Sequence, residues 1–342
     1  MSSSPPRPLK PVSSATIEWE SWEQGTRFGS RTRHLTRAAV GGTAYHVGVV
    51  LEELPPGKQS CPFHYHIHEE EHVFVLAGSL TLRLGRERFD MKPGDYACFP
   101  AGVPLGHCLE NYSDSDCRYI VVGERRADEV CVYPDSNKVA VDAVGRTILD
   151  LAATRGYWHG EDTGEAEAAQ PGPTDGAQEA PRPRPPISVD DVEWRQEGVP
   201  GSRHFGGESR HLTFEAVGAA YHVGMLIESP APGKRIAPRH YHMVEEEHAF
   251  ILEGEATLLL GDERYTMREG DYVCLPAGQR LGHSIVNSGS GPCRYLMIGE
   301  SSPNEVCVYP DSNKVYVRAL EPEPPLFDMA AKRRYWDGEQ TD

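Results

Sequence analysis

The stretch GKQSCPFHYHIHEEEHVFVLAG, residues 57–78, decides how this chain folds. A second stretch, GKRIAPRHYHMVEEEHAFILEG at residues 233–254, repeats its pattern at an offset of 176 residues. The correspondence continues without a gap over residues 45–139 and 221–315, where the segment VCVYPDSNKV occurs unchanged in both copies. The chain is therefore an internal duplication, and a feature present in both copies belongs to the repeated module.

The spacing of turn signals predicts an all-β fold. The chain has 34 glycines and 28 prolines, and short apolar and β-branched runs lie between them. Short antiparallel strands of this kind close best as a barrel or jelly roll. We expect a disordered tail over residues 1–16, a first domain over 17–161, a flexible linker rich in Pro, Gly, Ala and Glu over 162–187, and a second domain over 188–342.

Composition narrows the choice of partners. A formal net charge of −17 argues against binding to nucleic acid or to an anionic membrane surface. The chain contains no run of eighteen apolar residues, and its first residues lack the apolar core of a signal peptide, so we expect a cytoplasmic protein. The eight cysteines form no CxxC pair, which is typical of reduced thiols. The expected partner is a small-molecule substrate, and association into a homo-oligomer is left open.

Each copy contains a set of potential metal ligands. His64 and His66 lie two residues apart, so on a strand both imidazoles project from one face. Glu71 follows at an odd separation, and a bulge or short loop over residues 67–70 must return it to that face. His107 comes from a distant strand that barrel closure brings alongside. The predicted metal ligands are His64, His66, Glu71, His107, His240, His242, Glu247 and His283.

The donor set restricts the cofactor. Three neutral imidazoles and one carboxylate suit a divalent first-row transition metal, namely Fe, Mn, Ni, Cu or Zn, with up to two ions per chain. Neither a GxGxxG segment after a strand nor a P-loop occurs, so nucleotide-dependent chemistry is not expected. An ordinary barrel histidine would explain any one of these residues alone, but the repetition of the complete set favours metal binding.

These residues resemble the two sequence motifs of the cupin superfamily. The first motif matches Gly57, His64, His66, Glu71 and Gly78, and the second matches Gly94, Pro100, Gly102, His107 and Asn111. The second copy matches at Gly233, His240, His242, Glu247, Gly254, Gly270, Pro276, Gly278, His283 and Asn287. In both copies the HxH pair lies one residue farther from the first glycine, and the last histidine two residues farther from PxG, than is usual. The resemblance implies a bicupin with two tandem jelly-roll barrels of the double-stranded β-helix type.

The resemblance implies a metal-dependent enzyme but leaves the reaction open, because one fold supports many reactions. The leading hypothesis is a dioxygenase-type oxidoreductase that places oxygen and a small organic substrate at open metal positions, with Glu71 as a ligand and base. One alternative is an oxygen-independent isomerase, decarboxylase or lyase, in which the metal acts as a Lewis acid. Another is a non-enzymatic protein that binds a metal or a small molecule.

The two copies differ in the residues around the predicted metal ligands. The first copy has Cys61, His68, Arg83 and Cys108 where the second has Ala237, Val244, Leu259 and Ser284. We therefore expect the chemistry in the first copy, with Glu71, His68 and Arg83 as candidate catalytic residues. His68 would move a proton and Arg83 would hold an anionic substrate, unless both are simply solvated. His72 and His248 directly follow the glutamates and should face the opposite side in a structural role.

Overall fold

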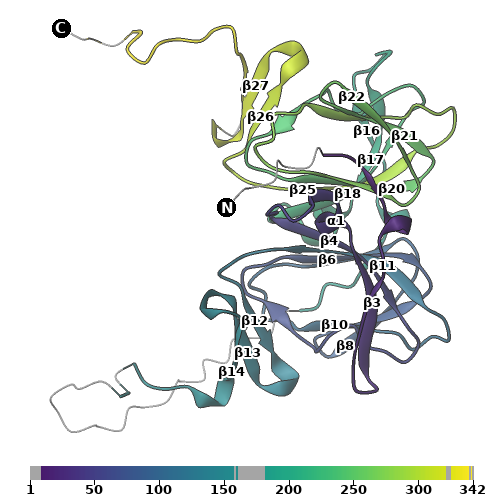
Figure 1. Cartoon of the computed structure of the whole chain (residues 1–342), viewed down its shortest axis with the longest axis vertical. Helices are drawn as coiled ribbons and strands as arrows, with labels where there is room; N and C mark the ends of the chain where they lie inside the picture. The colour runs from purple at the N-terminus through teal and green to yellow at the C-terminus, as the bar shows by residue number, and fades with distance from the viewer. Residues whose placement is uncertain (1–8, 158, 161–181, 321–324, 339, 341–342) are drawn as a thin grey trace.

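The structure of the protein is a computed structural model. It describes residues 9–157, 159–160, 182–320, 325–338 and 340. Two β-barrels stack on one another, and barrel 1 lies below barrel 2 in Figure 1. The all-β prediction is confirmed, since the described residues contain only two short α-helices, α1 (Leu35–Val40) and α2 (Leu212–Val217). Most of the predicted linker lies outside the described residues.

Barrel 1 consists of antiparallel sheets. Its seven-stranded sheet runs β15 (Ile187–Ser188), β9 (Asp95–Phe99), β6 (Glu71–Ala77), β11 (Cys117–Glu124), β4 (Val47–Leu54), β3 (Phe28–His34) and β2 (Glu20–Gln24). Its three-stranded sheet runs β10 (His107–Glu110), β7 (Leu80–Leu84) and β8 (Glu87–Met91). Its four-stranded sheet runs β14 (Thr147–Asp150), β13 (Lys138–Val141), β12 (Val130–Tyr133) and β5 (Tyr65–His66).

Barrel 2 repeats this architecture. Its seven-stranded sheet runs β1 (Val12–Ser13), β23 (Asp271–Leu275), β20 (Glu247–Glu253), β25 (Arg294–Glu300), β18 (Val223–Pro230), β17 (Gly206–His211) and β16 (Arg195–Gly198). Its three-stranded sheet runs β22 (Glu263–Arg268), β21 (Glu255–Leu260) and β24 (His283–Val286). Its four-stranded sheet runs β19 (Tyr241–His242), β26 (Val306–Tyr309), β27 (Lys314–Val317) and β28 (Leu326–Asp328).

Each barrel receives an edge strand from the segment that precedes the other domain. Strand β1 pairs with β23 of barrel 2, so the N-terminal segment crosses to the upper barrel in Figure 1. Strand β15, which precedes the second domain, pairs in the same way with β9 of barrel 1. Residues 1–16 were predicted to form a disordered tail, of which residues 1–8 lie outside the described residues, whereas the structure places Val12–Ser13 in a strand and Ser14–Thr16 in a 3-10 helix.

Strand β6 is buried on both faces, which explains its nearly continuous apolar sequence. Val73 and Val75 pack inside barrel 1, whereas Phe74 packs in the core between the two barrels. Gly78 follows the strand with a φ of 79°, and a Cβ at this position would lie 2.6 Å from the carbonyl oxygen of Asp116. Only glycine therefore fits the turn that ends the metal-binding motif.

Buried hydrogen bonds link the barrels. His72 Nδ1 lies 2.7 Å from Tyr96 Oη, which lies 2.6 Å from Thr213 Oγ1 of the second domain. A matching series of hydrogen bonds runs from barrel 2 to the first domain and joins His248 through Tyr272 to Thr36. Burial lowers the pKa of His72 to about 4, so its imidazole is neutral at pH 7. The prediction that His72 and His248 lie away from the metal ligands agrees with these contacts.

Candidate metal centres

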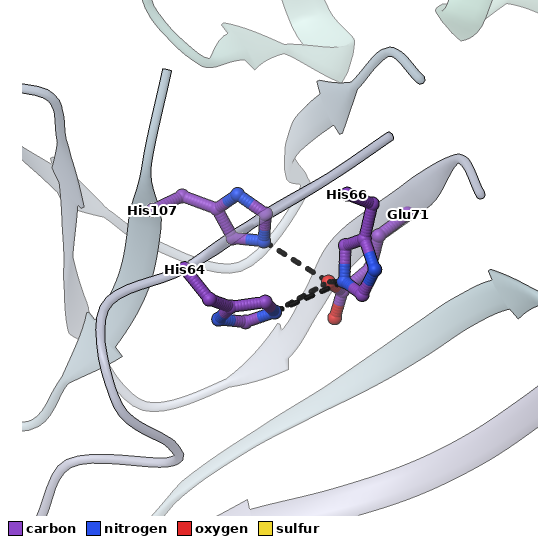
Figure 2. Close-up of side chains that lie close together, drawn as sticks. All are labelled: His64, His66, Glu71 and His107. Atoms are coloured by element: carbon purple, nitrogen blue, oxygen red, sulfur yellow. Dashed lines mark hydrogen bonds and ion pairs between the residues drawn. The ribbon is translucent and has the colours of Figure 1, made fainter. Parts of the chain in front are cut away.

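The four predicted ligands of barrel 1 come together in the structure. Their donor atoms all lie within 4.8 Å of one another, although they come from β5, β6, β10 and the segment before β5 (Figure 2). Glu71 Oε2 lies 3.0 Å from His107 Nε2, 3.3 Å from His66 Nε2 and 3.5 Å from His64 Nε2. Reciprocal backbone hydrogen bonds between His64 and His107 fix the two distant segments beside each other.

Glu129, which was not among the predicted site residues, holds the loop between His66 and Glu71 in place. The Glu129 carboxylate accepts hydrogen bonds from the backbone N–H groups of Ile67, His68 and Glu69, at 3.3, 3.0 and 2.9 Å. These bonds hold the loop over residues 67–70, which the odd spacing of Glu71 required. Strand β6 then starts at Glu71 with its carboxylate facing the histidines.

The outer imidazole nitrogens support metal coordination through Nε2. His64 Nδ1 lies 2.9 Å from the carbonyl oxygen of Pro62, and His66 Nδ1 lies 3.1 Å from Glu129 Oε1. An acceptor at Nδ1 keeps the proton there and leaves the Nε2 lone pair available to a metal. The donor set and its hydrogen bonds therefore fit a divalent transition metal.

Electrostatics also favour an anionic carboxylate among the histidines. Burial alone would raise the pKa of Glu71, but hydrogen bonds with His107, His64 and His66 lower it well below its usual range. Burial lowers the pKa of His107 to about 4, with a further contribution from His64. Burial lowers the pKa of His66, but hydrogen bonds to Glu129 and Glu71 raise it to about 9, so metal binding must displace a proton from this imidazole.

Barrel 2 reproduces this geometry. Glu247 Oε2 lies 2.8 Å from His283 Nε2, 3.4 Å from His242 Nε2 and 3.6 Å from His240 Nε2. His240 Nδ1 contacts the carbonyl oxygen of Pro238, and His242 Nδ1 contacts Glu305. His242 Nε2 is buried without a hydrogen-bond partner among the described residues, and a metal ion would satisfy this atom.

The centre in barrel 1 adjoins a cavity of about 300 Å³. All four ligands line it, together with Glu52 and Cys61. Its apolar lining includes Val73, Phe99, Leu109 and Val121. The Phe99 ring stacks on His107 with the ring centroids 3.7 Å apart, which fixes the orientation of this imidazole.

Access to the centre in barrel 2 is different. His242 and His283 line a pocket of only about 10 Å³, and Leu9 of the N-terminal arm forms part of its wall. Such a volume holds about one water molecule. Leu9 also packs against the apolar core of barrel 2. Arg184 stands at the matching place three residues before β15, but it is exposed and does not line the cavity of barrel 1.

Two candidate catalytic residues lie apart from this cavity. Arg83 makes a bidentate ion pair with Asp135, at 2.6 and 3.0 Å, and its guanidinium lies 3.8 Å from the centroid of the Phe63 ring. His68 Nδ1 lies 2.8 Å from the carbonyl oxygen of Asp128. Neither side chain is part of the cavity wall, so a catalytic role for either stays a prediction.

Two pairs of acidic residues near the metal centres were not predicted from the sequence. Glu129 and Glu305 occupy matching places just before the repeated VCVYPDSNKV segment, and Glu52 and Glu228 occupy matching places in β4 and β18. Repetition was the available signal for both pairs. Their contacts could not be read from the sequence, because Glu129 meets His66 only when β12 pairs with β5.

Comparison with known proteins identifies the family. The cupin domain family matches residues 50–123 and 226–299, one segment in each barrel. The chain therefore carries two tandem cupin domains, one in each barrel. The two domains confirm the predicted fold, and the two histidine–glutamate clusters support the predicted divalent metal, while the individual ligand assignments stay predictions.

Several characterised proteins are similar to this chain. Quercetin 2,3-dioxygenase of Bacillus subtilis (strain 168) is 26% identical over 238 residues, which cover 66% of each protein. Polyketide synthase CurC of Streptomyces cyaneus is 29% identical over 94 residues, covering 28% of this chain and 58% of that protein. The chain thus spans less than two thirds of the length of both relatives.

Among solved structures, the formate complex of Lactobacillus farciminis oxalate decarboxylase superposes with a TM-score of 0.53 at 19% identity. The match covers 88% of this chain and 87% of that chain, and it shows a shared fold. In the part of the chain that the structure describes, no helix is long and apolar enough to cross a membrane.

Proposed function

We propose that this protein is a metal-dependent oxidoreductase of the dioxygenase type that acts on a small organic substrate in barrel 1. The observation that carries this proposal is the cavity of about 300 Å³ beside four converged ligands, whereas the pocket that His242 and His283 line has a volume of only about 10 Å³. The similarity to quercetin 2,3-dioxygenase supports the choice of reaction class.

The residues of barrel 1 have separate roles in this proposal. His64, His66, Glu71 and His107 would hold the metal, which when bound would supply open coordination positions and redox chemistry. The Glu71 carboxylate lies at the cavity surface, where it can take a proton from a substrate hydroxyl group. Val73, Phe99, Leu109 and Val121 exclude water from the body of the substrate.

Oxygen consumption tests the proposal. Metal-reconstituted protein is mixed with phenolic, flavonoid and 1,3-dicarbonyl compounds in an oxygen electrode, and we expect uptake with at least one class. His107→Ala should abolish this uptake, whereas the matched variant His283→Ala should mainly lower metal content or stability. Equal turnover under strict anaerobiosis would instead favour the isomerase, decarboxylase or lyase, and equal loss in both variants would contradict the assignment to barrel 1.

A further inference from the structure

We infer that an ion pair between an arginine and an aspartate positions the metal ligands of each barrel. In barrel 1 it joins Arg83 to Asp135, and in barrel 2 it joins Arg239 to Asp311. These are positioning residues, because they act on the metal through its ligands and do not touch it. The inference rests on the metal binding of the proposed function and is independent of the reaction.

The two arginines occupy places in the sequence that do not match. Leu259 stands at the place of Arg83, and Phe63 stands at the place of Arg239, at the common offset of 176 residues. The two aspartates do match, because each lies in the segment VCVYPDSNKV, which is identical in both copies. Each barrel therefore supplies this aspartate with a guanidinium from a different element, so the ion pair itself is the feature that both barrels keep.

The two guanidinium groups nevertheless occupy equivalent places in space. The Arg83 guanidinium lies 3.8 Å from the centroid of the Phe63 ring, so it lies against the residue that matches Arg239. It donates two hydrogen bonds to the Asp135 carboxylate, at 2.6 and 3.0 Å. The Arg239 guanidinium donates to Asp311 through Nε and Nη2. Phe63 and Arg83 together thus replace Arg239 alone.

Both arrangements pack against the glycine that precedes the last metal ligand. A Cβ on Gly106 would lie 2.4 Å from the Phe63 ring, and a Cβ on Gly282 would lie 3.1 Å from Cγ of Arg239. Neither glycine has a positive φ, so close packing and not backbone conformation excludes a side chain here. In barrel 1 this contact lies one residue before His107, whose backbone exchanges hydrogen bonds with that of the ligand after Phe63.

The ion pair also joins two sheets that each carry a ligand. Arg83 lies on β7, which pairs with β10, the strand that begins at His107. Asp135 follows β12, which pairs with β5 at His66. A bidentate ion pair of this kind fixes orientation as well as distance. It therefore holds His66 and His107 at a separation at which both can reach one ion.

Transfer of the barrel 2 arrangement into barrel 1 tests this inference without an assay of activity. All proteins are full-length and carry His240→Ala and His242→Ala, so that bound Co²⁺ reports on barrel 1 alone. Arg83→Leu removes the guanidinium and installs the residue that barrel 2 has at this place. Phe63→Arg combined with Arg83→Leu rebuilds the ion pair from the place of Arg239. The dissociation constant and the visible absorption spectrum of Co²⁺ are measured for each protein.

Arg83→Leu should weaken Co²⁺ binding about tenfold, the lower end of the range for residues that orient metal ligands. The double variant should return the dissociation constant and the spectrum to those of the parent protein. Asp135→Asn should abolish this rescue, because the transferred guanidinium then lacks its charged partner. Arg88→Leu, which removes an ion pair with Glu110 on the same sheet, is the matched control and should leave Co²⁺ binding unchanged.

Arg83→Leu with the affinity and spectrum of the parent protein overturns the inference and leaves metal binding standing. Weaker binding that the double variant does not restore also overturns it, because the effect then does not come from the ion pair. If either variant does not fold, Asp135→Asn alone decides, since it removes the charge and keeps the shape of the side chain. An unchanged affinity then overturns the inference, and about tenfold weaker binding supports it. A parent protein that binds no Co²⁺ overturns the metal site of the proposed function and this inference with it.

Discussion

Glu129 Oε1 lies 3.1 Å from His66 Nδ1, and the same carboxylate holds the loop that precedes Glu71. One side chain thus orients two of the four ligands in barrel 1. Glu129→Gln removes the charge and part of the hydrogen bonding, and we expect it to weaken metal binding in barrel 1 by about 10- to 100-fold. Titration against a competing chelator measures this change.

The matched variant Glu305→Gln is the control for this prediction. Glu305 contacts His242 and the loop before Glu247 in the same way, so its replacement should weaken metal binding in barrel 2 and leave barrel 1 unchanged. If Glu129→Gln leaves both metal affinities at the wild-type value, Glu129 does not support the centre.

Metal content depends on the two histidine pairs. The wild type should bind up to two divalent ions per chain after reconstitution, and the combined change of His64 and His66 to alanine should leave about one. Changing His240 and His242 as well should leave none, and chelators or acid should strip the wild type because the ligands must be deprotonated. Elemental analysis measures the content, and metal retained by the fourfold variant would contradict the ligand assignment.

Acid should weaken the contact between the barrels through its buried histidines. Burial lowers the pKa of His72 to about 4, whereas an unfolded histidine titrates near pH 6.5. Between these values the unfolded state binds more protons, so the free energy of unfolding falls with falling pH by about 1.4 kcal/mol per pH unit for each such histidine.

Urea unfolding of metal-free protein between pH 6.5 and pH 5 tests this dependence. His72→Gln keeps a polar group beside Tyr96 but cannot be protonated, so its free energy of unfolding should vary less steeply with pH than that of the wild type. His248→Gln should behave alike, because burial lowers the pKa of His248 to about 3. Parallel curves for variant and wild type would refute the prediction.

Leu9 should slow the loss of metal from barrel 2. The pocket at His242 and His283 holds about 10 Å³ beside Leu9, whereas the barrel 1 centre adjoins an open cavity. Removal of metal by excess chelator should therefore show a fast and a slow phase. Leu9→Ala should accelerate the slow phase by about tenfold, as expected if part of the burial energy of one leucine opposes opening.

Arg184→Ala is the control for the predicted effect of Leu9 on the loss of metal. Arg184 stands at the matching place beside barrel 1 but does not line its cavity, so its replacement should leave both phases unchanged. A slow phase of the same rate in Leu9→Ala would show that the N-terminal arm does not control access.

The fold and the ligand set follow from local sequence patterns. His64 and His66 share a face because a strand has a period of two, and Gly78 marks a turn that admits no other residue. The partners of long side chains do not follow in this way. Arg83 was expected near the substrate, but its position on β7 allows it to reach Asp135, which lies 52 residues away in the chain.

The polar group at Glu52 and the exchanged arms were also beyond sequence reasoning. The residues around Glu52 show that it lies in a strand, but the existence of a cavity depends on the side chains of several other strands. The short segment around Val12 has no local feature that distinguishes pairing with barrel 2 from pairing with barrel 1. Only the assembled sheet, in which Val12 lies opposite Tyr272, determines its partner.

Strand β1 pairs with barrel 2 and strand β15 pairs with barrel 1, so the two barrels are arranged like the subunits of an arm-exchanged dimer within one chain. A single unit with the same arm could pair it in this way only with a second copy, so the arrangement corresponds to two arm-exchanged barrels joined in one chain. Fusion makes the association of the barrels independent of protein concentration. It also allows the two arms to diverge, and the chain now carries Leu9 on one arm and Arg184 on the other.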